Sequence, residues 1–147
     1  MSRFVTLGRE FRFNGNDYRG HVVASADAFY FVIDPHGMPH AGGLLGAAFE
    51  AVREHFNSKG AQTCYTRQLA ELPAEITSDP DWPVRQTQGS VLVVPREAVA
   101  NVHFPWLWLD NRVCISAAEV EFSTVFNLFR RGNIRRSLAD IGWTLAN

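Results

Sequence analysis

The stretch that most constrains the fold of this chain is residues 118–145, AEVEFSTVFNLFRRGNIRRSLADIGWTL. Its first half alternates with a period of two, so that one side of an extended chain is mostly apolar: Val120, Phe122, Thr124 and Phe126. A period of two is typical of a strand that packs one face against a core. We therefore expect a strand over residues 119–126, followed by a basic turn.

A helix is predicted directly after this turn. Asn133 is a good N-cap residue, and from there apolar residues recur at helical spacing: Ile134, Leu138, Ile141 and Leu145. Gly142 weakens or ends the helix, and Trp143 would pack just beyond its last turn. Because so short an amphipathic helix is marginal alone, it must dock on a sheet. We predict one shared core of strand and helix residues: Phe122, Phe126, Ile134, Leu138 and Ile141.

The rest of the chain favours short antiparallel strands. They are expected over residues 3–7, 10–13, 18–24, 29–33, 91–94, 99–109 and 112–116, with frequent turn signals between them. Pro105 inside the 99–109 strand marks an edge or a bulge. Both faces of residues 29–33 are apolar, and a helix over residues 44–56 would cover the second face. Residues 65–72 could be helix or strand.

Length and composition indicate one ordinary globular domain over residues 1–147. The chain is 46% hydrophobic and 20% charged. Its net charge of -1 gives no support to bulk nucleic-acid binding. We find no apolar signal core at the N-terminus and no apolar run of roughly 20 residues that could span a bilayer. Two cysteines without a CxxC pattern suit a reducing compartment, so a soluble, cytoplasmic protein is expected.

Together these elements predict an α+β domain: a strongly bent antiparallel sheet or partly open barrel, a C-terminal closing helix and an additional middle helix. This organisation resembles the pleckstrin-homology-like fold, including its bacterial and GRAM-type relatives. The likeness covers residues 18–33 and 91–143 and rests on element order. The resemblance implies a module that binds phosphoinositides, peptides or other proteins. The basic loop between the first two strands, on which phosphoinositide binding depends in that family, has no match, because Asn14-Gly15-Asn16-Asp17 carries no positive charge.

One candidate site is the basic turn, whose four guanidinium groups lie around the expected helix start: Arg130, Arg131, Arg135 and Arg136. Helix N-termini attract anions through unpaired N–H groups and the helix dipole. The turn could therefore bind a phosphate, a carboxylate or an anionic lipid. The competing interpretation is a solvated turn whose arginines pair with Glu119, Glu121 or Asp140.

A second candidate is an apolar surface on the expected 99–109 strand. Its bulky residues alternate onto both faces: Phe104, Trp106, Leu107, Trp108 and Leu109. Either one face fills the core and a loop covers the other, or the surface binds a protein partner or a second copy of the chain. The sequence predicts a two-fold dimer through this strand.

No motif argues for catalysis, a metal or a cofactor. His36 and His40 are four residues apart in a Gly/Pro loop, with no second paired motif to complete a metal site. No Ser/His/Asp or Cys/His set has a local signature. A non-catalytic binding or assembly module is therefore the leading hypothesis. Anion or anionic-lipid binding is the alternative, and an enzyme with an unrecognised site is the weakest of the three.

Overall fold

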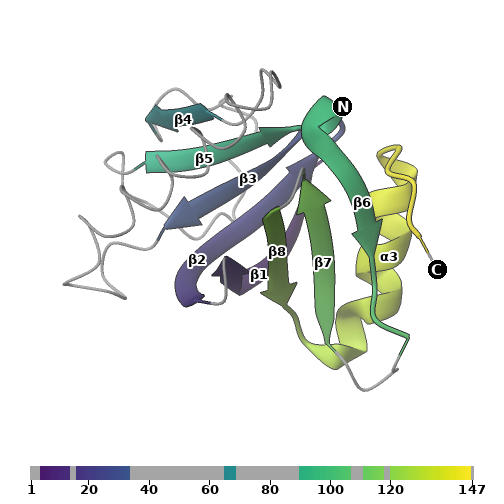
Figure 1. Ribbon diagram of the computed structural model, residues 1–147. Coiled ribbons are helices and arrows are strands. Elements are labelled where there is room, and N and C mark those ends of the chain that lie inside the picture. Colours follow the sequence, from purple (N-terminus) through teal and green to yellow (C-terminus); the bar gives the residue numbers. More distant parts are fainter. Residues whose placement is uncertain are drawn as a thin grey trace.

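The computed structural model describes residues 4–13, 16–33, 65–68, 90–106, 111–117 and 120–146 (Figure 1). The strands in this part of the chain are β1 (Phe4–Phe13), β2 (Asn16–Ser25), β3 (Ala28–Ile33), β4 (Tyr65–Gln68), β5 (Ser90–Pro95), β6 (Val99–His103), β7 (Arg112–Ala117) and β8 (Val120–Val125). The helical elements are the 3-10 turns η2 (Arg96–Ala98) and η3 (Leu128–Arg130) and the helix α3 (Arg131–Asp140).

The strands pair in the order β4-β5-β3-β2-β1-β8-β7-β6, and every pairing is antiparallel. Two groups of four strands, β4-β5-β3-β2 and β1-β8-β7-β6, meet where β1 pairs with β2. The two groups run in different directions, and α3 lies beside β6 (Figure 1). The order ends at β4 and β6, so among the described residues the sheet does not close into a barrel. The expected antiparallel sheet with a C-terminal helix is confirmed.

Gly8 lets the backbone of β1 approach β8 closely. A Cβ atom there would overlap the Thr124 side chain and the Val125 carbonyl, and the β1–β2 register shifts on both sides of Gly8. Next to this close approach, the Thr124 hydroxyl donates a hydrogen bond to the Glu10 carbonyl at 2.7 Å. The two separate strands predicted over residues 3–7 and 10–13 are wrong, because the glycine introduces an irregularity and does not interrupt the strand.

The main core lies between the bent sheet and α3. The predicted shared core is confirmed, since all of its members are buried in one cluster: Phe122, Phe126, Ile134, Leu138 and Ile141. Aromatic rings join the two groups of strands to the helix end. The centroids of Phe31 and Phe122 are 4.6 Å apart, and those of Phe29 and Trp143 are 4.4 Å apart. The helix is therefore part of the core and not an appendage.

The end of α3 is as predicted, but its start is not. Gly142 has φ 98°, and the Trp143 N–H donates to the Leu138 carbonyl at 3.0 Å, as in a Schellman motif. The helix begins at Arg131, two residues before the predicted N-cap Asn133. The reason is Asn127, whose side-chain oxygen accepts the Phe129 N–H at 3.1 Å and starts the η3 turn early.

The 99–109 strand is shorter than predicted. β6 ends at His103, so Pro105 follows the strand and does not lie inside it. Beyond that point the Arg131 guanidinium donates a hydrogen bond to the Pro105 carbonyl, which is therefore not available for strand pairing. β6 is an edge strand, as Pro105 suggested, and Ala146 makes a parallel bridge to His103 on its outer side.

The second face of the β2-β3-β5 sheet is buried, as its two-sided apolar pattern indicated. Its buried residues form a separate cluster: Val23, Ala28, Val32, Val91 and Val93. The helix over residues 44–56 that was expected to cover this face lies outside the described residues. Of the ambiguous stretch 65–72, Tyr65–Gln68 is a strand paired with β5, and the remainder lies outside the described residues.

Candidate functional site

The four arginines of the basic turn do not converge on one point. Arg130 donates to the Thr6 carbonyl on β1 at 3.4 Å. Arg131 donates to the Pro105 carbonyl at 2.6 Å, and its guanidinium carbon lies 5.5 Å from the centroid of the Phe104 ring. Both of these side chains therefore tie α3 to neighbouring segments. Arg135 and Arg136 lie a turn further along the helix and are exposed.

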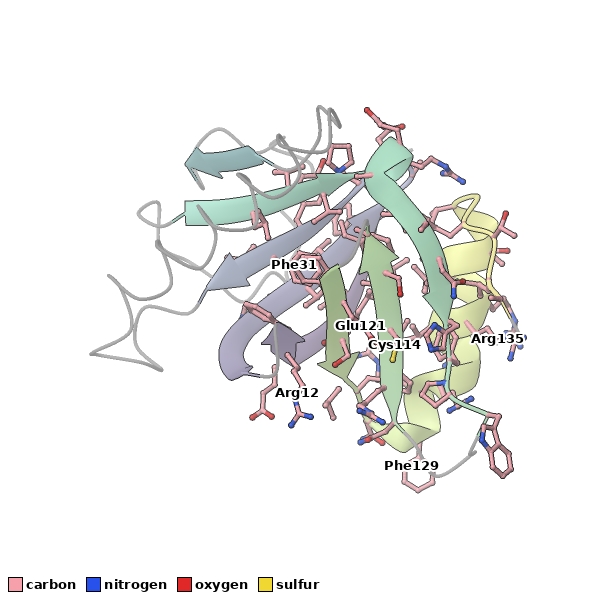
Figure 2. All side chains as sticks on the ribbon, viewed as in Figure 1. Arg12, Phe31, Cys114, Glu121, Phe129 and Arg135 are labelled. Carbon is pink, nitrogen blue, oxygen red and sulfur yellow. The ribbon has the colours of Figure 1, made fainter. Side chains whose placement is uncertain are left out.

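Arg135 and Arg136 line a shallow hollow of about 460 Å³ on the outer side of α3. Its other lining residues are small or apolar: Gly132, Ala139, Trp143 and Leu145. Figure 2 shows Arg135 on this outer side of the helix. The hollow has two guanidinium groups and an apolar wall, but it lies along the helix and not at its N-terminus. Only half of the predicted anion-binding set is thus brought together.

Three exposed apolar side chains lie close to the ends of β6 and β8 and the start of α3. Among the described residues the large exposed hydrophobic side chains are Trp106 (87% exposed), Val125 (41%) and Phe129 (93%). We call these three residues, two of which are aromatic, the aromatic end. Val125 ends β8, Phe129 lies in η3 directly before α3, and Trp106 follows the last residue of β6 by three positions. Phe129 points away from the sheet (Figure 2). An isolated exposed apolar residue needs no explanation, but a group of them is typical of an interaction surface.

Hydrogen bonds hold the aromatic end in place. Phe129 is fixed in η3 by the Asn127 side chain. Trp106 follows Pro105, whose carbonyl is bound by Arg131, and Phe104, whose ring lies 5.9 Å from that of Phe126. The two exposed rings are therefore carried on supported backbone, which lowers the entropy lost when a surface docks.

The structure separates the predicted interface residues. Phe104 is buried in the core with 5% of its surface exposed, whereas Trp106 is almost fully exposed. Leu107, Trp108 and Leu109 lie outside the described residues. Phe129 was missed because its position in the basic turn gave no alternating pattern. A bulky aromatic residue within a polar turn, here Phe129 in the stretch from Asn127 to Arg130, is the sequence pattern that could have indicated an exposed ring.

A second set of contacts missed in the sequence surrounds Arg96. Its guanidinium donates to the Ala26 carbonyl at 2.6 Å and to the Gly142 carbonyl, and it stacks over Trp143 at 4.7 Å. The Trp143 indole N–H in turn donates to the Ser25 carbonyl at 2.8 Å. Arg96 thus joins the β2–β3 turn to the end of α3, and its role is structural.

Neither a metal site nor a membrane-spanning helix emerges from the described part of the chain. In that part no group of three or more His, Cys, Asp and Glu residues is placed to hold a metal ion. No helix there is both long and apolar enough to cross a bilayer. Cys114 is a buried thiol on β7. His36, His40 and Cys64 lie outside the described residues.

Comparison with known proteins identifies no family for this chain. No protein-family model matches the sequence, and neither a curated protein nor a solved structure shows significant similarity to it.

Proposed function

We propose that the protein is a non-catalytic binding or assembly module that associates with itself or with a protein partner through the aromatic end. The observation that carries this proposal is the exposure of Trp106, Val125 and Phe129 close to the ends of β6 and β8 and the start of α3. Trp is enriched among the residues that dominate binding energy at protein interfaces. Rings held on supported backbone are suited to that role.

Self-association is the first form to test, because it needs no identified partner. Light scattering at micromolar concentration should give a mass above the monomer for the wild-type chain. Replacing Trp106 and Phe129 with Ser should return the mass to that of the monomer, and the urea unfolding midpoint should stay unchanged because both side chains are exposed. Thr144→Ser is a control, since Thr144 is exposed beyond the end of α3. A strictly monomeric wild type would remove self-association and make a protein partner the remaining form.

Binding of an anion or an anionic lipid is a second candidate, supported by the hollow beside Arg135 and Arg136. Two guanidinium groups beside an apolar wall suit a ligand with a phosphate or carboxylate group and an apolar part. The test is co-sedimentation at low salt with vesicles that contain phosphatidylserine, compared with purely zwitterionic vesicles. Equal binding to both vesicle types, or to neither, would argue against this function.

The pleckstrin-homology-like fold also remains a proposal. It is supported by the chain order, in which β1, β2, β3 and β5 are sheet neighbours, β6, β7 and β8 form a second meander, and a helix follows. The strand β4 and the long connection around it are additions to that plan. A fold of this kind would be consistent with a binding module but would not identify its ligand.

A further inference from the structure

A short row of charges crosses the sheet beside the aromatic end. Val125 on β8 is the register partner of Glu10 on β1 and of Arg112 on β7. Cross-strand partners project from the same face of a sheet, with Cβ atoms about 5 Å apart. Glu10, Val125 and Arg112 therefore form a row with a negative, an apolar and a positive member. Glu10 and Val125 are exposed, and Arg112 is half-buried.

Such a row is complementary to a reversed copy of itself. We propose that two copies of the chain pair face to face over this row, about a two-fold axis that runs along β8 through Val125. The axis reverses the row, so Glu10 lies opposite Arg112 of the partner subunit, and Arg112 lies opposite the partner's Glu10. Val125 then meets its own copy. This pairing rests on the self-association proposed above and assigns it a face and an axis.

Charge and the state of the β6 edge both favour this face. Opposite charges are matched twice in each dimer, and a net charge of -1 per chain brings little overall repulsion. Pairing through the outer edge of β6 is less accessible, because the Ala146 N–H already donates to the Val102 carbonyl there at 2.9 Å. The closed two-fold arrangement is also the commonest form of soluble homo-oligomer.

Charge reversal tests the pairing directly. In a Glu10→Arg homodimer, and equally in an Arg112→Glu homodimer, both attractive pairs become repulsive. The dimer dissociation constant measured by sedimentation velocity should rise roughly 30-fold in each case, as expected for two surface pairs. An equimolar mixture of the two variants restores both attractions, so a heterodimer should form with nearly wild-type affinity. Glu97→Arg makes the same charge change on η2, at the other end of β6, and should leave the constant unchanged.

The outcomes distinguish this pairing from the broader function. A monomeric wild type would overturn the pairing together with self-association, and a protein partner would then be the remaining form of the proposed function. A wild-type dimer that tolerates Glu10→Arg, or a pair of reversed variants that fails to form a heterodimer, would overturn the pairing alone. Arg112→Glu is first checked for folding by circular dichroism. If it does not fold, Val125→Lys replaces it, because two lysines would then face each other on the axis and must weaken the dimer.

Discussion

Leu138 offers the most direct test of how α3 is held to the sheet. Its side chain is fully buried in the core cluster, and its carbonyl accepts the Trp143 N–H at 3.0 Å. Leu138→Ala removes three carbon atoms, which corresponds to about 2.4 kcal/mol of lost burial. A cavity term adds to this, and buried Leu→Ala changes in total cost about 2–5 kcal/mol. Because the Schellman turn fixes the helix end, the site can collapse little, and we expect roughly 3–4 kcal/mol.

Equilibrium urea unfolding measures this loss, and thermal unfolding should show a midpoint lower by about 10 °C for a chain of this length. Arg136→Ala is the matched control, because Arg136 is exposed on the same helix and should change stability by less than about 0.5 kcal/mol. If Leu138→Ala unfolds at the wild-type midpoint while the control behaves as expected, α3 is not part of the cooperative core and the packing argument is refuted.

Three further predictions concern single features of the structure. Gly8→Ala should lower the free energy of unfolding by about 1–3 kcal/mol, because the alanine methyl group would overlap β8. An unchanged urea midpoint would contradict the close approach of β1 to β8 at this position. Arg96→Met keeps an apolar stem but removes the hydrogen bonds to the β2–β3 turn and the helix end, so stability should fall by about 1–3 kcal/mol and the near-ultraviolet signal of Trp143 should change; an unaltered signal would refute the link. Replacing Arg135 and Arg136 with Gln should abolish binding to phosphatidylserine vesicles and leave stability unchanged, and vesicle binding that survives would place the anion site elsewhere.

The sequence predicted the elements whose patterns reflect local burial. Apolar residues recur with a strand period of two over residues 120–126 and with helical spacing in α3, so each residue of their shared core could be predicted. Gly142 could be foreseen as a helix end because positive φ favours glycine. The basic turn misled the prediction, because Asn133 and Asn127 are both good capping residues. Only the three-dimensional arrangement decides that Asn127 starts the turn.

The candidate site was harder to foresee than the fold. Whether Arg131 is available to a ligand depends on Pro105, which is 26 positions away in the chain. Burial of Phe104 beside exposure of Trp106 requires β6 to end at His103, and the apolar run through residues 104–109 masks that end. The row at Val125 depends on strand register, which no single segment encodes.

The pairing of β1 with β8 has a consequence for how quickly this protein reaches its native state. Glu10 and Val125 are register partners, so these two neighbouring strands pair through a contact between positions that are far apart in the sequence. A large loop must be closed before this ladder yields any stabilisation, and chains dominated by such distant contacts fold in milliseconds to seconds. We expect slow refolding after dilution from urea. During synthesis β1 has no β8 to pair with until all of the strands between them have been made, so the β1 edge that pairs with β8 is exposed to incorrect pairing for that time.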